Sequence, residues 1–102
     1  MQLPTRTLLT LICEAALEQR LIKDLEQLGA PGWTLSDARG TGSRGVRRAG
    51  WDNDGNIRLE IVCSRDKAEA IAHHVQQRYY HNFAMICYLS TVEVLRPEKF
   101  SP

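Results

Sequence analysis

The segment from residue 56 to residue 63 alternates apolar and charged side chains, and this is the clearest strand pattern in the chain. The apolar residues on one parity are Ile57, Leu59, Ile61 and Cys63, and the charged residues on the other are Arg58 and Glu60. Successive side chains of a β-strand point to opposite faces, so the pattern predicts a strand with one face against a core and a polar face away from it. The fold must therefore contain a sheet with two unlike faces.

Two segments flanking this strand carry apolar residues at helical spacing. In residues 14–28 the apolar stripe is Leu17, Leu21, Leu25 and Leu28. The charged residues, which fall mostly on the other side, are Glu18, Lys23, Asp24 and Glu26. Gly29 and Pro31 are expected to end this helix. Ser64 is the predicted N-cap of a second helix over residues 65–80. Its predicted inward stripe is Ala68, Ile71, Ala72, Val75 and Tyr79. Each helix therefore presents one apolar stripe to a core.

Three further segments are predicted to be strands. Residues 7–13 and 84–95 are apolar on both parities, whereas residues 32–38 place Trp33 and Leu35 on one face and polar side chains on the other. The order is then β-α-β-β-α-β, which is typical of the ferredoxin-like α+β sandwich with four antiparallel strands and both helices on one face. At 102 residues, the chain is expected to form a single domain, residues 1–102.

The second face of such a sheet is left without a helix to cover it. Its apolar residues are expected to be Leu8, Ile12, Ile86, Tyr88, Val92 and Val94, next to Arg58 and Glu60. An exposed apolar area of this kind usually marks an interface. We therefore predict a homo-oligomer packed sheet to sheet, with a closed ring as its natural form.

Composition narrows the class of protein. The net charge is only +1, which argues against a large nucleic-acid footprint. Neither a long apolar run nor an apolar leader opens the sequence, so a soluble cytoplasmic protein is expected. The three cysteines, Cys13, Cys63 and Cys87, all fall in apolar strand segments, and we expect them to be reduced and buried.

The connection from residue 40 to residue 55 is the predicted functional segment. Together with Arg39 it holds five of the seven glycines, and its basic residues are all arginine. A long connection without regular structure is usually functional in a compact domain. The glycines at 40, 42 and 45 can turn main-chain N–H groups toward an anion, and the groups that can join them are Ser43, Arg44 and Arg47. The segment therefore predicts an oxyanion site, and the alternative is a flexible, solubilising insertion.

Two other patterns in the sequence do not predict a site. Gly40, Gly42 and Gly45 match the spacing of the dinucleotide fingerprint, with Glu60 at the expected distance. That site needs a helix directly after the glycines, and residues 47–55 carry no apolar helical stripe. The three histidines, His73, His74 and His81, have no metal-ligand spacing.

Three stretches resemble one known family: Gly-Trp-Thr at 32–34, Gly-Ser-Arg-Gly-Val-Arg at 42–47, and the last strand from Tyr88 to Leu95. They are similar to the PII-like signalling proteins of the inorganic-carbon group, whose members are associated with carboxysomes or with bicarbonate transporters. This resemblance implies a trimer with AMP or ADP in the clefts between subunits, with cyclic AMP as a further candidate. It also implies that residues 40–55 form a T-loop, which becomes ordered when ligand is present, with bicarbonate at its base.

The resemblance also implies which residues bind. Those expected at the nucleotide are Thr34, Ser36, Gly42, Ser43, Arg44, Arg47, Tyr88 and Ser90. Those expected at bicarbonate are Gly42, Arg44, Gly45 and Arg47. No catalytic residue, metal or prosthetic group is expected. Classical relatives hold a triphosphate with a glycine- and lysine-containing loop, and residues 76–84 have neither residue type, so ATP should bind poorly.

The resulting hypothesis is a regulatory binding protein and not an enzyme. Nucleotide and bicarbonate would set the order of the T-loop, which would dock on a partner such as a membrane bicarbonate transporter. One alternative is an RNA-binding module that uses the Arg/Gly segment. Another is a slow nucleotide hydrolase in which Asp52 and Asp54 hold a cation. The sequence names neither the partner nor the direction of regulation.

Overall fold

The computed structural model describes residues 1–42, 45–47 and 55–101. The main elements are β1 (Thr5–Glu14), α1 (Glu18–Leu28), β2 (Thr34–Ala38), β5 (Asn56–Cys63), α2 (Arg65–Tyr79) and β6 (Ile86–Glu93). The short elements are the strands β3 (Gly40–Gly42) and β4 (Gly45–Arg47) and the 3-10 turns η1 (Ala15–Leu17) and η2 (Pro97–Phe100).

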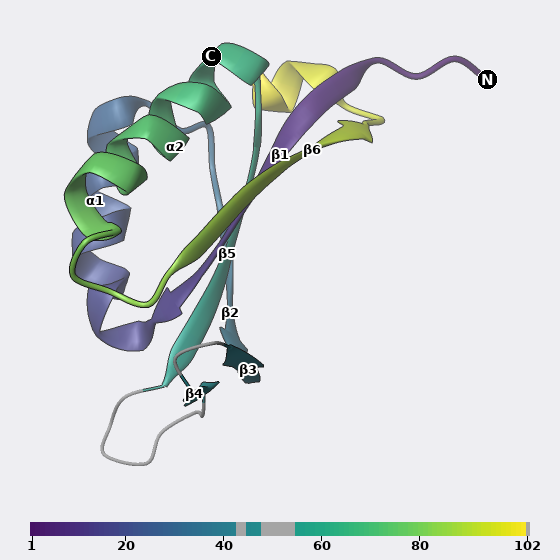
Figure 1. Cartoon of the computed structure of the whole chain (residues 1–102). Helices are drawn as coiled ribbons and strands as arrows, with labels where there is room; N and C mark the ends of the chain where they lie inside the picture. Colours follow the sequence, from purple (N-terminus) through teal and green to yellow (C-terminus); the bar gives the residue numbers. More distant parts are fainter. Residues whose placement is uncertain (43–44, 48–54, 102) are drawn as a thin grey trace.

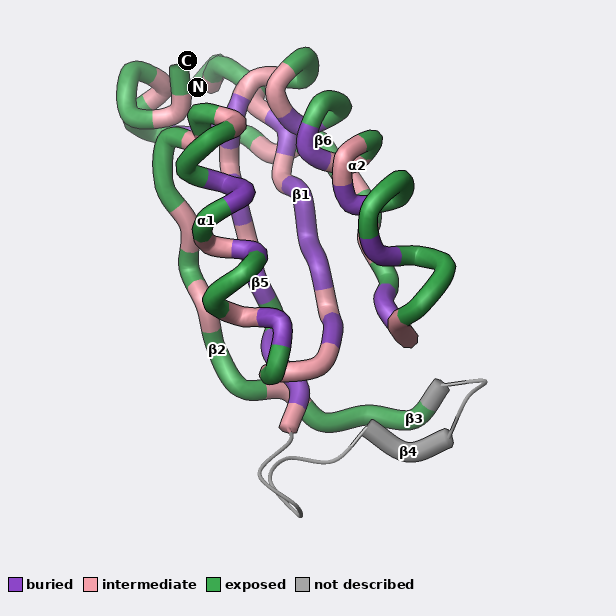
Figure 2. The backbone as a smooth tube through the Cα atoms, turned by 90° about the vertical axis from the view of Figure 1, so that its left-hand side faces the viewer, coloured by how far each residue is buried: buried purple, intermediate pink, exposed green. Residues whose placement is uncertain are grey.

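The four long strands form one antiparallel sheet in the order β2-β5-β1-β6, and both helices cover the same face of it (Figure 1). This is the ferredoxin-like α+β arrangement, so the predicted fold class is confirmed. The start of β1 and the turn η2 lie at one end of the sheet, and the β3–β4 hairpin lies at the other (Figures 1 and 2). No helix among the described residues is long and apolar enough to cross a membrane.

The core lies between the sheet and the two helices, as the buried inner faces in Figure 2 show. Ile57, Leu59 and Ile61 are each at most 1% exposed, which confirms the alternation of β5. Leu17, Leu21 and Leu25 form the buried stripe of the first helical segment. In α2, every residue of the predicted apolar stripe is buried except Ala72, which is half-buried. Trp33, which directly precedes β2, and Leu35 within β2 are half-buried and pack against this core.

Both helix boundaries follow from local chemistry. Gly29 takes the left-handed conformation at a φ of 77°, and its N–H donates to the carbonyl of Glu26. A side chain at Gly29 would be strained, so glycine suits the end of α1. At the start of α2, the Ser64 hydroxyl accepts the N–H of Lys67 at 3.2 Å. The predicted cap and stop signals are therefore both confirmed.

Asp24 does not lie on the solvent side of α1, where the helical pattern predicted most charged residues. It is 9% exposed and accepts a hydrogen bond from the Tyr79 hydroxyl, and its Oδ2 atom lies 3.0 Å from His74 Nε2. Burial raises the pKa of Tyr79 to about 12, and the hydrogen bond to Asp24 adds to this shift. The cluster of Asp24, His74 and Tyr79 therefore joins the two helices through polar groups at the edge of the core.

The helix-free face is partly as expected. Ile86 and Tyr88 are 41% and 46% exposed, while Leu8, Ile12 and Val92 are half-buried. Val94 was also expected on this open face, but it is buried. It follows the end of β6, and its N–H donates to the carbonyl of Pro4, so the N-terminal segment lies alongside it.

The connection expected to lack regular structure contains an antiparallel hairpin. β3 pairs with β4 through Gly40 with Arg47, Thr41 with Val46, and Gly42 with Gly45. The central pair is β-branched on both sides, which favours strands. Strands therefore follow the glycines of the dinucleotide-like motif where that fold would need a helix. Residues 43–44 and 48–54 lie outside the described residues.

Candidate functional site

Two hollows follow the edge of the sheet formed by β2 and β5, on its helix-free face. In the strand register, Thr34 lies opposite Glu60 and Ser36 lies opposite Arg58. Residues two apart in a strand share a face and lie roughly 7 Å apart, so these two pairs are neighbours. We name the hollows the Thr34 hollow and the Ser36 hollow.

The Thr34 hollow has a volume of about 300 Å³. Its lining residues are Pro31, Gly32, Trp33, Thr34, Glu60, Val62, Lys99 and Phe100. Two aromatic rings and a valine supply apolar surface, and a hydroxyl, a carboxylate and an ammonium group lie among them. A Cβ added at Gly32 would meet no atom within 4 Å, so the space beside it is open. Apolar walls with a few polar groups suit a planar organic ring that carries hydrogen-bonding edges.

The Ser36 hollow has a volume of about 410 Å³ and a different character. Its lining residues are Ile12, Ser36, Asp37, Ala38, Arg39, Gly40, Thr41, Asn56 and Arg58. The lining includes two arginines, two hydroxyl residues and one carboxylate, that of Asp37. A Cβ at Gly40 would also meet no atom within 4 Å, which leaves the backbone there open to close approach. Guanidinium groups next to an open backbone suit a phosphate or carboxylate.

An ion pair lies between the two hollows. Arg58 Nη2 is 3.1 Å from Glu60 Oε2, and the two side chains are 44% and 37% exposed. An exposed pair of this kind contributes little to stability, and a guanidinium has five N–H donors. Arg58 can therefore turn part of its donor set to a ligand in the Ser36 hollow while Glu60 remains available to the Thr34 hollow.

The residues expected from the sequence fall in different places. Thr34 and Ser36 are exposed on the helix-free face, one in each hollow. Gly42 and Gly45 are paired in the β3–β4 hairpin. The backbone of Arg47 pairs with Gly40, which lines the Ser36 hollow, so the hairpin brings position 47 beside that hollow. Ser43 and Arg44 lie outside the described residues.

Tyr88 and Ser90 are not among the residues that line the two hollows. They lie on β6, paired with β1, and β6 is the edge strand opposite β2. Three strand spacings separate β6 from Thr34 and Ser36 on β2, roughly 14 Å. Within a single chain, the structure therefore does not bring Tyr88 and Ser90 together with Thr34 and Ser36.

Of the lining residues, sequence reasoning assigned Thr34, Ser36 and Gly40 to a site, and among those that it missed are Arg39, Arg58, Lys99 and Phe100. For Arg58 a signal existed, since a charged residue on the polar parity of β5 must face the same way as Ser36. Arg39 follows β2 directly. Lys99 and Phe100 lie in the C-terminal turn η2, and no local pattern connects that turn to β2.

Comparison with known proteins places this architecture. A family model described as nitrogen regulatory protein P-II matches residues 6–99. A PII-like signalling protein from Thermus thermophilus is 41% identical, with a TM-score of 0.82 over 98% of this chain and 99% of that one.

Two structures of CPII, a nitrogen regulatory PII-like protein from Thiomonas intermedia, are also similar. One, bound to ADP, AMP and bicarbonate, has a TM-score of 0.88 at 20% identity over 99% of this chain and 98% of that one. The other, bound to ADP and bicarbonate, has a TM-score of 0.86 at 21% identity over 97% of each chain. At these identities the likeness shows a shared fold.

Proposed function

We propose, from the premise that this chain belongs to the nitrogen regulatory protein P-II family, that it is a signalling protein that binds AMP or ADP along the β2–β5 edge. One observation carries the proposal: a hollow with aromatic walls and a hollow with two guanidinium groups lie side by side on the same edge. A nucleotide needs both environments, one for its base and ribose and one for its phosphate. Of the two CPII structures that share this fold, one was solved with ADP, AMP and bicarbonate bound and the other with ADP and bicarbonate.

The base and ribose would occupy the Thr34 hollow, with the Thr34 hydroxyl and the Glu60 carboxylate as hydrogen-bonding partners. Ser36 would lie beside the nucleoside on the way to the phosphate. The phosphate would lie in the Ser36 hollow, where Arg39 and Arg58 offer charged donors. The loop groups that would complete the phosphate site are Gly42, Ser43, Arg44 and Arg47.

Bicarbonate would bind at the base of the T-loop, next to the phosphate. The groups proposed for it are Gly42, Arg44, Gly45 and Arg47. The pairing of Gly40 with Arg47 supports this place, because it joins the hairpin to the rim of the Ser36 hollow. Bicarbonate is a planar oxyanion, which a guanidinium can bind through two parallel hydrogen bonds.

A homotrimer would complete the site. Ile86 and Tyr88 are large side chains exposed on the helix-free face, and contact with a second copy would cover them. Tyr88 and Ser90 line neither hollow of their own chain, so a neighbouring copy would bring its Tyr88 and Ser90 to the nucleotide. Closed rings of identical subunits bring the two edges of a sheet together in this way.

The regulatory output would be the order of residues 40–55. Fixing a segment costs about 1–2 kcal/mol per residue in backbone entropy, and ligand binding would have to offset that cost. The ordered or free segment would dock on a partner, such as a membrane bicarbonate transporter or a carboxysome component. This would make the protein a regulator of inorganic-carbon uptake or use.

Isothermal titration calorimetry of the whole protein with AMP, ADP, ATP and bicarbonate tests the proposal. We expect AMP and ADP to bind, ATP to bind more weakly, and Arg58→Gln to reduce AMP affinity by roughly tenfold or more, the loss of one charge-assisted hydrogen bond. Arg20→Gln, an equal change of charge at an exposed position on α1, should leave affinity unchanged. Absence of heat with every adenine nucleotide would refute nucleotide binding.

A further inference from the structure

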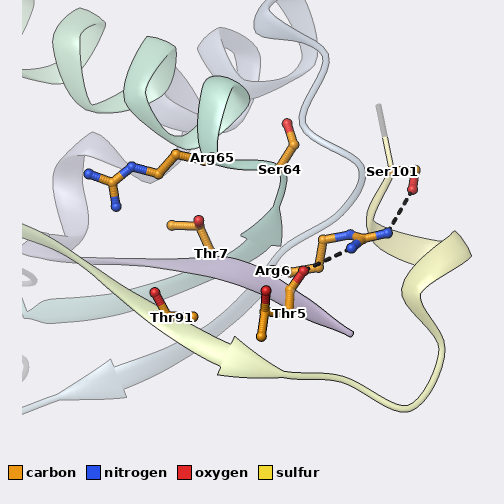
Figure 3. A pocket seen from close by; sticks show the side chains of 7 residues that line it. All are labelled: Thr5, Arg6, Thr7, Ser64, Arg65, Thr91 and Ser101. Atoms are coloured by element: carbon orange, nitrogen blue, oxygen red, sulfur yellow. Dashed lines mark hydrogen bonds between the residues drawn. The ribbon is translucent and has the colours of Figure 1, made fainter. Parts of the chain in front are cut away.

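A third pocket lies on the other face of the sheet, where α2 begins. Its volume is about 430 Å³, and Figure 3 shows its lining residues: Thr5, Arg6, Thr7, Ser64, Arg65, Thr91 and Ser101. The start of β1, which supplies three of these residues, lies at the end of the sheet opposite the β3–β4 hairpin (Figure 1). None of its lining residues belongs to the two hollows of the β2–β5 edge. We name it the α2-start pocket.

The lining of the α2-start pocket is entirely polar. It consists of five hydroxyl residues and two arginines, and no carboxylate is among them. Asp66, in the first turn of α2, is the nearest acidic residue in the sequence, and it does not line the pocket. A pocket with hydroxyl donors, positive charge and no carboxylate favours an anion over a cation.

The start of α2 points main-chain donors at this pocket. The first turn of a helix has N–H groups with no partner inside the helix. In α2, the Lys67 N–H donates to the Ser64 hydroxyl at 3.2 Å, and the Ala68 N–H donates to the Ser64 carbonyl at 2.9 Å. No acceptor for the N–H groups of Arg65 and Asp66 is found in the part of the chain that the structure describes. Of the two residues only Arg65 lines the pocket, so its N–H, with the partial positive charge of a 15-residue helix, remains for a ligand there.

Thr7 supplies a second and independent sign of a ligand. The residue is 5% exposed, and no described residue forms a hydrogen bond with its hydroxyl. Figure 3 shows the Thr7 oxygen rising from β1 toward the start of α2. Among the described residues, the fully enclosed side-chain atoms without a hydrogen-bond partner are Thr10 Oγ1 and His74 Nε2, so the Thr7 oxygen, which is not among them, opens into the pocket. A ligand in the pocket would give this nearly buried hydroxyl a hydrogen-bond partner.

Arg6 provides a fixed positive charge at the mouth of the pocket. Its Nη1 donates to the Thr5 carbonyl at 2.8 Å, and its Nη2 donates to the Pro97 carbonyl at 3.2 Å and to the Ser101 hydroxyl at 3.3 Å. These bonds hold the guanidinium in place and leave other N–H donors unused. The Arg65 head instead pairs with Glu69 at 2.8 Å, so Arg65 serves the pocket through its backbone N–H.

We propose that the α2-start pocket binds a phosphate-class oxyanion, either inorganic phosphate or the phosphate group of a small metabolite. The anion accepts hydrogen bonds from the N–H group of Arg65 and from the Thr7 hydroxyl. Arg6 balances its charge. This site is separate from the proposed nucleotide site and does not depend on it.

The test is a titration of the ¹⁵N-labelled protein with inorganic phosphate, at constant ionic strength and with AMP present in excess. If the proposed function is right, AMP fills the β2–β5 edge and keeps phosphate out of it. If the proposed function is wrong, the positions of the shifted amide signals still show whether phosphate binds at the β2–β5 edge or in the α2-start pocket. We expect the backbone amide signals of Arg65 and Asp66 to shift as phosphate is added and to saturate with a single dissociation constant. Shifts confined to Arg39, Gly40 and Thr41 would put phosphate in the Ser36 hollow and overturn the proposal.

Thr7→Val and Thr10→Val form a matched pair of variants. Both residues lie on β1 and are at most 5% exposed, but Thr10 points to the helix-free face and lines no pocket described above. We expect Thr7→Val to weaken phosphate binding roughly tenfold or more and Thr10→Val to leave it unchanged. Equal affinity in the two variants would refute the role of Thr7.

A further variant covers the case in which Thr7→Val does not fold. Thr91→Val changes an exposed pocket residue, and its amide spectrum should keep the native pattern while phosphate affinity falls. Glycerol 3-phosphate, titrated in parallel, separates the two sources of the anion. If glycerol 3-phosphate binds more tightly than inorganic phosphate, the ligand is a phosphorylated metabolite. If inorganic phosphate binds more tightly, the ligand is the free ion. If neither shifts the Arg65 amide signal, the proposed site is wrong.

Discussion

Replacing Tyr79 by phenylalanine should destabilise the fold by about 2 kcal/mol. The change keeps the ring and removes only the hydroxyl that donates to Asp24. A hydrogen bond to a charged group contributes about 1.5–3 kcal/mol, and here the acceptor is a carboxylate that is 9% exposed. Among the described residues, the side chain then left next to Asp24 is that of His74, whose Nε2 lies 3.0 Å away. The loss is therefore expected near the middle of that range.

Thermal and urea unfolding of the whole protein measure this loss. For a domain of about 100 residues, 2 kcal/mol lowers the Tm by roughly 8–16 °C. Both proteins must be compared at one concentration, since subunit association would add to the measured stability. Tyr80→Phe is the matched control, because Tyr80 is the next residue, is 38% exposed and makes no hydrogen bond from its side chain among the described residues.

The reasoning would be refuted if Tyr79→Phe and Tyr80→Phe unfolded at the same urea concentration. That result would mean that the contact between the two helices through Asp24 adds nothing beyond the packing of the ring. A large loss in both variants would instead indicate a general effect of removing a phenol from α2. Only a selective loss at position 79 supports the polar connection between α1 and α2.

Three further predictions follow from the same structure. The pKa of Tyr79 is raised from 10.0 to about 12. The protonated hydroxyl therefore contributes fully to stability below pH 10, and this contribution is lost as the pH rises toward 12. Urea unfolding at increasing alkaline pH should show the loss in the unmodified protein and not in Tyr79→Phe. Gly40→Val places a side chain in open space within the Ser36 hollow, so calorimetry should show weaker AMP binding with an unchanged Tm. Burial raises the pKa of Cys13 to about 12 and that of Cys87 to about 11, so a thiol reagent at pH 8 should label the native protein slowly and the unfolded protein at once.

Local patterns in the sequence were enough to predict the elements. The strand from 56 to 63 was predicted at its observed bounds. Its apolar and charged residues alternate, so a shift of the strand by one residue would move every apolar side chain from the core to the other face. Gly29 and Ser64 marked helix ends because their roles depend only on neighbouring backbone groups. Each of the two helices has one apolar stripe, and each can therefore cover one part of a sheet. Few arrangements of four strands and two such helices bury these stripes, and the ferredoxin-like order is among them.

What the pattern could not reveal are contacts between residues far apart in the chain. Asp24 looked like a solvent-facing charge because its partners, His74 and Tyr79, lie on another helix. The hollows are likewise assembled from separate pieces: Lys99 comes to Thr34 from the C-terminal turn. The Thr7 hydroxyl faces Ser64 only because β1 passes beneath the start of α2.

The sequence by itself determined the type and order of the elements and the residues that face the core, because those depend on spacing along the chain. The tertiary structure alone decided which polar groups share a pocket and that Tyr88 and Ser90 lie at the edge opposite Thr34 and Ser36. Strand order and the path of the C-terminal turn place these groups. Both are consequences of packing the whole sheet against two helices, and no short stretch of sequence encodes them.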